Sequence, residues 1–207
     1  METTNKSIDA VAIITRVYPA GNPTRDLLLR HGELVARKAI RILDRSPWLE
    51  ADRSFVIQTA MLHDIGIGRT RCPDLGCTGT LPYVCHGIEG RKILDRLNLQ
   101  RHGRVCERHV GVGISARQVE RQQLPLPARD MLPRSVEERL ICYADKFFSK
   151  TDNGRHEKTI EEITVGLARY EASYADRFLT LHRFFTQGAD NTAGSAGDPL
   201  HQGERHP

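Results

Sequence analysis

The chain has 207 residues, of which 39% are hydrophobic and 27% charged, and its formal net charge is +4 at pH 7. This composition is ordinary for a globular protein, and the length suits one domain that needs no disulfides for its stability. The small basic excess is spread along the chain, which argues against nucleic-acid binding but could help attract an anionic substrate. No segment approaches the roughly 18 apolar residues needed to cross a membrane, and the start lacks the basic region of a signal peptide.

Helical periodicity dominates the chain and strand alternation is nearly absent. A first helix is expected over 26–43, with Pro47 marking its end or the loop after it. A second helix is expected from a cap at Asp52 or Ser54 to His63. A loop rich in Gly, Pro and Cys is expected over 66–82. Two further helices are expected over 84–97 and 105–109.

The second half of the chain is predicted in the same way. Three prolines within 123–133 exclude a long helix there. Ser135 and Glu138 form a capping box that starts a helix reaching Phe148. Apolar residues at helical spacing from 160 to 185 then predict one continuous last helix. The predicted organisation is an N-terminal segment (1–25), a helical domain (26–150), a C-terminal helix that packs on the domain or on a partner (151–186) and a disordered tail (187–207).

The five cysteines are an odd number in a chain that does not need disulfides, so we expect reduced thiols and a cytoplasmic location. Cys72, Cys77 and Cys85 lie near one another in sequence and could form a small metal-binding knuckle. Their spacing is loose and a fourth ligand is not evident. We therefore favour ordinary thiols over a knuckle.

The chemistry concentrates around a His-Asp pair. His63 and Asp64 follow the apolar stretch TAML, where adjacent polar groups are costly to bury unless something compensates them. A divalent metal would do so, because imidazole and carboxylate are suitable ligands and Asp64 has two oxygens that could bridge two ions. Asp145, in the apolar context ICYADKFF, is the natural candidate to complete the site.

Each candidate has a simpler explanation when it is taken alone. A histidine can be a boundary residue, the start of a helix or a satisfied core residue, and an aspartate can pair with a neighbouring arginine. His63 and Asp64 alone could be a hydrogen-bonded pair at a helix end. The order and spacing of the whole set favour a metal site, and the set consists of His31, His63, Asp64, His86, His109 and Asp145.

This ordered set resembles the HD domain of metal-dependent phosphohydrolases. The resemblance lies in a helical His31, in AMLHDIG at 60–66 and in Asp145 within YADK. His86 in HGIEGRKIL and His109 in ERHVGVGI resemble the extra histidines of branches that hold two metals, such as the bis(5′-nucleosyl)-tetraphosphate hydrolases and the cyclic-di-GMP phosphodiesterases. The likeness is greatest to an uncharacterised HDIG branch and covers about 26–150. It implies an all-α helical bundle with a C-terminal helical extension.

The resemblance also implies one or two ions of Fe, Mn or Zn in two positions that share one carboxylate. The first position has as ligands His31, His63, Asp64 and Asp145, and the second has Asp64, His86 and His109. The implied reaction is hydrolysis of a phosphoester or phosphoanhydride bond, in a nucleotide or dinucleotide, by a metal-activated water.

Two departures from the family pattern affect the expected substrate contacts. Many HD phosphohydrolases carry Lys directly after HDIG to hold a phosphate, whereas Ile67 stands there in this chain. Arg69, Arg71 or Lys146 would have to take that role. The GYP extension of the cyclic-di-GMP enzymes is missing, which argues against that substrate.

Two other functions are compatible with the same ligand set. A di-iron oxygenase of the HD type would consume oxygen in the presence of a bound iron pair. A noncatalytic nucleotide-binding regulatory module would bind nucleotides and never hydrolyse them. The sequence does not select one phosphorylated substrate. It is compatible with a homodimer as well as with a monomer.

Overall fold

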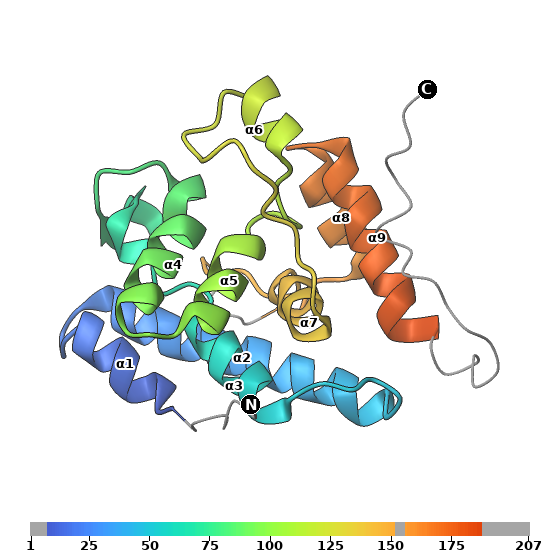
Figure 1. Ribbon diagram of the computed structural model, residues 1–207, viewed down its shortest axis with the longest axis horizontal. Helices are drawn as coiled ribbons and strands as arrows, with labels where there is room; N and C mark the ends of the chain where they lie inside the picture. The colour runs from blue at the N-terminus through green and yellow to red at the C-terminus, as the bar shows by residue number, and fades with distance from the viewer. Residues whose placement is uncertain (1–7, 152–155, 188–207) are drawn as a thin grey trace.

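The computed structural model describes residues 8–151 and 156–187, and this part of the chain is almost entirely helical (Figure 1). Its α-helices are α1 (Ala10–Val17), α2 (Pro23–Arg45), α3 (Arg53–Leu62), α4 (His86–Arg96), α5 (Gln100–Arg108), α6 (Ala116–Arg121), α7 (Val136–Asp145), α8 (Ile160–Ala168) and α9 (Ala172–Gln187). The expected all-α class is confirmed. Residues 188–207, nearly all of the tail predicted to be disordered, lie outside the described residues. Over the described ranges, no helix has both the length and the apolar character needed to cross a membrane.

The connection between α3 and α4 carries short regular elements. These are the 3₁₀ turns η1 (Ile67–Arg69), η2 (Pro73–Leu75) and η3 (Tyr83–Cys85) and the strands β1 (Arg71–Cys72) and β2 (Cys77–Thr78). The strands pair antiparallel, with Cys72 opposite Cys77. All five cysteines are free, and among the described residues no cysteine belongs to a group of side chains that could hold a metal ion.

Helix α2 is the longest helix among the described residues, and α3 packs beside it (Figure 1). It begins at Pro23, three residues before the predicted start, because the Asn22 side chain accepts a hydrogen bond from the backbone N–H of Thr24 and caps the helix. The helix ends at Arg45, just before Pro47, as predicted. Asp52, one of the two predicted caps, accepts from the N–H of Phe55 and starts α3.

Two apolar clusters divide the interior, and α2 takes part in both. Near its start, α2 gives Leu28 to a cluster shared with α1, the end of α3 and α4. Further along, it gives Val35 and Ala39 to a larger cluster with α5, α7, α8 and α9. His31 stands between these positions on the same helix and is itself only 3% exposed. The polar site is therefore enclosed by apolar packing on the helix that carries it.

Helix α1, which the sequence analysis did not predict, braces the turn that follows His63-Asp64. The Tyr18 hydroxyl donates a hydrogen bond to the carbonyl of Ile65 (2.7 Å) and accepts one from the backbone N–H of Gly68 (3.2 Å). A buried tyrosine normally finds such a partner. The N-terminal segment thus fixes the backbone directly after the His-Asp pair.

The last periodic segment folds as two helices, so the prediction of one continuous helix is wrong. A short turn around Tyr170 joins α8 to α9, and the ring of this residue is 82% exposed. Helix α9 packs back along α8 and stacks Phe178 and Phe185 on Tyr143 of α7. A continuous helix would carry those two rings away from α7. This long-range contact, which periodicity does not contain, overrides local helical preference.

Two smaller differences concern α5 and α6. Helix α5 begins at Gln100, five residues before the predicted start at residue 105. Helix α6 was not predicted, although Ser115 and Gln118 form a capping box that signals its start. The connection over 123–133 contains no α-helix, in agreement with its three prolines.

A buried histidine outside the site predicts acid sensitivity. His102 on α5 contacts Gln58 (3.0 Å) and packs edge-on against Phe55, and burial, helped by Arg101, lowers its pKa from 6.5 to about 4. The unfolded chain therefore binds this proton more readily. The resulting stability is fully present above pH 6.5 and is lost as the pH falls toward 4, by about 3 kcal/mol at most.

We expect His102→Gln to unfold with a flatter dependence on pH than the wild type over this interval. Denaturant unfolding of both proteins above pH 6.5 and near pH 4 measures the difference. Parallel curves for the two proteins would show that His102 does not carry this sensitivity.

Candidate metal centre

The structure brings together all six side chains that were predicted as metal ligands. They form two groups whose donor atoms lie within 4.8 Å of one another. The first group is His31, His63, Asp64 and Asp145, and the second is Asp64, His86 and His109. All six are buried.

Helix ends supply most of these residues. His63 caps the C-terminus of α3, His109 caps that of α5, and Asp145 is the last residue of α7. The carbonyl groups at a helix C-terminus carry partial negative charge, which favours a nearby cation. Three such ends meeting at one point make the centre electrostatically suited to a positive ion.

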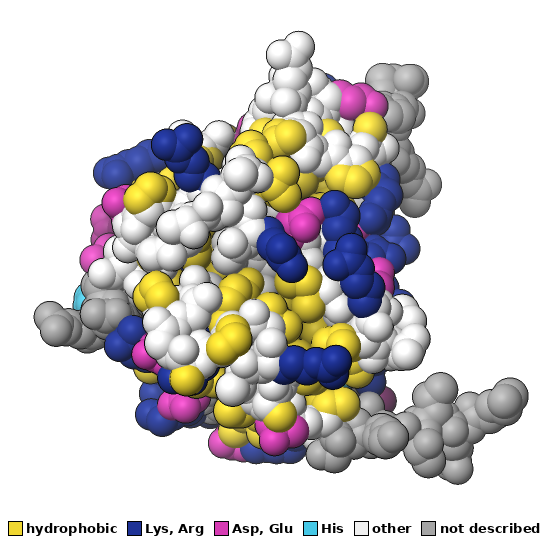
Figure 2. All heavy atoms as spheres, turned by 90° about the vertical axis from the view of Figure 1, so that its left-hand side faces the viewer, with side chains coloured by type: hydrophobic (Ala, Val, Ile, Leu, Met, Phe, Trp, Pro, Cys, Tyr) yellow, Lys and Arg dark blue, Asp and Glu magenta, His cyan; other side chains and the backbone are white. Residues whose placement is uncertain are grey.

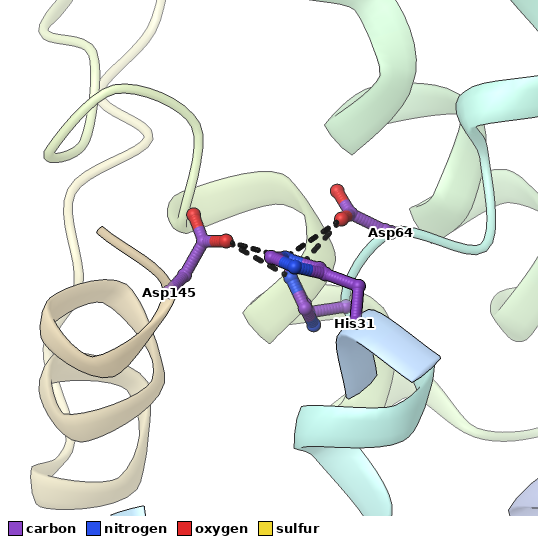
Figure 3. Close-up of side chains that lie close together, drawn as sticks. His31, Asp64 and Asp145 are labelled. Carbon is purple, nitrogen blue, oxygen red and sulfur yellow. Dashed lines mark hydrogen bonds and ion pairs between the residues drawn. The ribbon is translucent and has the colours of Figure 1, made fainter. Parts of the chain in front are cut away.

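At the first position, two imidazoles face two carboxylates. His31 Nε2 lies 2.8 Å from Asp145 Oδ1 and 3.5 Å from Asp64 Oδ2. His63 Nε2 lies 3.2 Å from Asp64 Oδ2 and 3.4 Å from Asp145 Oδ1. Figure 3 shows the two carboxylates reaching the His31 ring from different sides, Asp145 from α7 and Asp64 from the turn after α3.

At the second position, the other oxygen of Asp64 faces a second pair of imidazoles. Asp64 Oδ1 lies 3.4 Å from His86 Nε2 and 3.3 Å from His109 Nε2. The two imidazole Nε2 atoms are 3.1 Å apart. Asp64 therefore presents one oxygen to each position, which is the arrangement of a bridging carboxylate.

Backbone carbonyls fix the orientation of three of the histidines. In each, Nδ1 lies 2.6–2.7 Å from the carbonyl oxygen of the residue three positions earlier, so Nδ1 carries the hydrogen and donates it. Whenever the ring is neutral, this leaves Nε2 as an acceptor aimed at the centre, as second-shell contacts do for metal-bound histidines. The three pairs are His63 with Ala60, His86 with Tyr83, and His109 with Cys106.

The contacts around Asp64 Oδ1 indicate whether a metal ion would fit the second position. With the Nδ1 hydrogens given to carbonyls, neutral His86 and His109 place two acceptor nitrogens 3.1 Å apart with no hydrogen between them. Asp64 Oδ1 is buried beside them without a hydrogen-bond donor. Three acceptors in close contact repel one another unless a cation lies among them. The donor set therefore fits a metal ion and is poorly satisfied by protein contacts alone.

The carboxylates of the centre are ionised. Burial opposes their ionisation, but His63 and Lys150 hold the pKa of Asp64 well below its usual range, and Lys146 and Lys150 do the same for Asp145. Burial also opposes the imidazolium form of His63, yet the two carboxylates outweigh it and raise the pKa of His63 to about 9. The first position thus attracts a positive charge, and a metal ion would replace the His63 proton.

The remaining imidazoles are held in the neutral form that binds metal. Burial, reinforced by the Lys150 ammonium, lowers the pKa of His31 to about 4. Burial lowers the pKa of His86 to about 3, and it also lowers that of His109. Neutral imidazole is the ligand form, so these three rings need no deprotonation near neutral pH.

The basic residues of the site differ in part from those predicted. Lys146 contacts Asp145 Oδ2, whereas Arg69 and Arg71 are exposed, and within the described residues neither arginine pairs with a carboxylate of the centre. Their predicted contact with phosphate stays a prediction. Sequence reasoning missed Lys150, whose ammonium lies 2.9 Å from Asp64 Oδ2 and 3.6 Å from Asp145 Oδ1. Its place near the end of the YADKFFSK motif was the signal available.

Because Gly66 has no side chain, the turn that follows His63-Asp64 can pack closely against α4. A Cβ at this position would lie 2.1 Å from the His86 carbonyl oxygen and 2.2 Å from the Gly90 nitrogen, both backbone atoms. We expect Gly66→Ala to push α4 and its His86 away, to cost about 1–3 kcal/mol of stability and to lower the metal content. Thermal unfolding and metal analysis measure both effects.

Gly166 on α8 gives a matched control, because a Cβ there meets nothing within 4 Å. Gly166→Ala should leave stability unchanged or raise it by about 0.5–1 kcal/mol. Equal behaviour of the two variants would show that Gly66 does not position α4.

No protein-family model matches the chain. Among solved structures, the chain is similar to the HD domain of the L. monocytogenes phosphodiesterase PgpH in complex with cyclic-di-AMP. The TM-score is 0.50, with 17% identity over 89% of this chain and 92% of that one. The chain has the HD-domain fold. This likeness concerns the fold and does not carry over the neighbour's activity.

Two curated relatives of the chain are named as methyltransferases, whereas the structural neighbour is named as a phosphodiesterase. The chain is 38% identical over 125 residues to a tRNA (cytidine(56)-2'-O)-methyltransferase of Picrophilus torridus, and 28% identical over 163 residues to a protein of the same name from Thermoplasma volcanium. These matches cover 60% and 78% of this chain but only 32% and 42% of the relatives. An uncharacterised protein of Methanocaldococcus jannaschii is 30% identical over 60% of this chain and 66% of that protein. The chain thus spans less than half of each methyltransferase.

Proposed function

We propose that this HD domain is a phosphohydrolase of the HDIG type, which cleaves a phosphoester or phosphoanhydride bond in a nucleotide or dinucleotide with the help of divalent Fe, Mn or Zn. The observation that carries the proposal is the double role of Asp64. Its two oxygens face two separate groups of imidazoles, at 3.2 Å from His63 Nε2 and 3.3 Å from His109 Nε2. A carboxylate between two such groups is typical of sites that hold two ions.

The chain's own residues would divide the work of hydrolysis. When bound, divalent ions lower the pKa of water and so supply a hydroxide nucleophile near neutral pH. The six His and Asp ligands would hold the ions, while Lys146 and Lys150 place two ammonium groups beside the carboxylates of the centre. Negative charge grows on the phosphoryl oxygens as the bond breaks, and fixed ammonium groups would stabilise it.

The comparisons support a nucleotide substrate without identifying one. The ligand of the PgpH structure is the cyclic dinucleotide cyclic-di-AMP, and the names of two relatives refer to tRNA. Methyl transfer itself is not what we propose, because this chain matches less than half of those relatives and its buried centre gathers histidines and aspartates that could hold metal ions. Ribonucleotides are accordingly the substrates to test first.

The two lysines at the centre, Lys146 and Lys150, favour hydrolysis over the oxygenase alternative. The imidazole and carboxylate ligands suit both reactions, but an anionic phosphate substrate gives two ammonium groups at the centre a direct role. The full ligand set likewise supports turnover over a silent nucleotide-binding module.

The test is a hydrolysis screen on protein purified without oxygen and then supplied with Mn²⁺, Fe²⁺ or Zn²⁺. Adenine ribonucleotides, dinucleotides and dinucleoside polyphosphates are offered, and the products are separated by ion-exchange chromatography. We expect metal-dependent release of a nucleotide or phosphate product, with Asp64→Ala as the inactive control. Oxygen consumption without a phosphate-containing product would identify an oxygenase, and tight nucleotide binding without turnover with any metal would identify a regulatory module.

A further inference from the structure

A hollow lies between the end of α7 and helix α8, and Lys146, which contacts the metal centre, is part of its lining. Its volume is about 390 Å³, within the size range of pockets that bind small molecules. We call it the α8 pocket, and its lining includes Lys146, Lys158, Glu162, Ile163, Arg169 and Tyr170.

The charge of the α8 pocket favours an anion. Three of its lining side chains are cations and one is a carboxylate. That carboxylate, Glu162, already accepts hydrogen bonds from the backbone N–H of Thr159 (2.7 Å) and from His156 (3.0 Å). Over the described ranges, Lys158 and Arg169 form no ion pair. Their charges are free to meet a ligand.

An aromatic ring stands at the same pocket. Tyr170 is 82% exposed, the most exposed large hydrophobic side chain among the described residues, and Ile163 is buried at 3% in the same lining. An exposed ring next to cations is the combination that single-stranded nucleic-acid sites use, since bases stack on the ring while cations contact the phosphates.

The α8 pocket and the metal centre share one side chain. Lys146 lines the pocket and its ammonium contacts Asp145 Oδ2, a carboxylate of the first metal position. A ligand that reaches from one to the other therefore passes Lys146. On the face of the molecule that carries α1 and α4, the basic side chains lie in several separate groups (Figure 2).

We propose that the α8 pocket binds a nucleobase of the substrate together with the phosphate next to it. The inference rests on the proposed function, since it places the bond that is cut at the metal centre and a second nucleotide beyond it. The base stacks on Tyr170, and Lys158 and Arg169 contact the phosphate. The substrate is then a free dinucleotide or the end of a single-stranded oligonucleotide, two sources with the same chemistry.

The test measures binding separately from turnover. The probe is fluorescein-labelled diadenylate with a phosphorothioate linkage that resists hydrolysis, and its affinity for the metal-loaded protein is measured by fluorescence anisotropy. We expect Tyr170→Ala and Arg169→Ala each to weaken binding about tenfold, in the range of one lost stacking or phosphate contact. Tyr170→Phe should bind like the wild type, because it keeps the ring. Arg16→Ala, an exposed arginine of α1, controls for net charge and should also bind like the wild type.

The outcomes distinguish a failure of the proposed α8 pocket from a failure of the proposed hydrolysis. Hydrolysis of diadenylate with an unchanged KM in Tyr170→Ala would overturn the pocket and leave the proposed function standing. Binding that depends on Tyr170 without hydrolysis would support the pocket and contradict the function. A longer oligoadenylate that binds more tightly than diadenylate points to an RNA end, and equal affinity points to a free dinucleotide. Variants that change the oligomeric state in sedimentation, with unchanged probe affinity, would reassign the surface to contact between copies and overturn the inference.

Discussion

Replacing Asp64 by Ala is expected to remove bound metal and hydrolytic activity together. The side chain faces both metal positions, with Oδ2 toward His63 and Oδ1 toward His86 and His109, so its loss affects both at once. Loss of a second-shell residue typically reduces metal affinity or activity by roughly 10–100-fold, and we expect loss of this shared ligand to exceed that range. Metal analysis and turnover with the best substrate of the hydrolysis screen measure the two effects.

Asp64→Asn is the companion variant, because it keeps the volume of the side chain while it removes the charge and replaces one acceptor oxygen with an NH2 donor. Circular dichroism and thermal unfolding establish that both variants are folded. A folded Asp64→Ala protein with its full metal content and full turnover would contradict the assignment of Asp64.

Replacing Lys150 by Met is expected to lower kcat/KM about 100-fold while leaving the metal content at or above that of the wild type. The ammonium lies 2.9 Å from Asp64 Oδ2 and is only 14% exposed, so under the proposed function it would add fixed positive charge next to the phosphate of the substrate. Removing one such preorganised donor typically costs about 10²–10³ in rate. Metal binding should not weaken, because the variant removes a cation that competes for the same carboxylates.

Lys150→Arg and Lys92→Met complete this experiment. The arginine variant keeps the charge and should recover part of the activity. Lys92 on α4 is exposed and pairs with Glu89, so its replacement by Met removes a lysine of ordinary surface type and should leave kcat/KM unchanged. If Lys150→Met loses its metal along with its activity, the lysine serves to hold the carboxylates in place and does not act on the substrate.

The proposed ligands could be predicted because their signals are local. His63 and Asp64 are polar neighbours in an apolar stretch, and Asp145 is a carboxylate in another, so burial without compensation was implausible for each. Helical spacing is a local signal too, so most helices were also predicted correctly. Whether the six residues bind metal stays a prediction, but the structure brings them together from the ends of α3, α5 and α7, the start of α4 and the interior of α2.

What could not be predicted depends on contacts between distant segments. Lys150 lies beyond the end of α7, and the direction of its side chain is set by the turn that follows Lys146, which no periodicity describes. Tyr170 had the spacing of a core residue, but the packing of α9 on Tyr143 breaks the helix there and leaves the ring exposed. The brace from Tyr18 to the turn after Asp64 joins residues 47 positions apart.

The most direct test of the central claim is the number of metal ions per chain, measured by plasma mass spectrometry. The protein is purified without oxygen and without a metal-binding affinity tag. Our account predicts about two transition-metal ions per chain, with about one lost on changing His86 or His109 to Ala. One ion or fewer, unaffected by those two changes, would contradict a two-metal centre bridged by Asp64 and reduce His86 and His109 to structural residues.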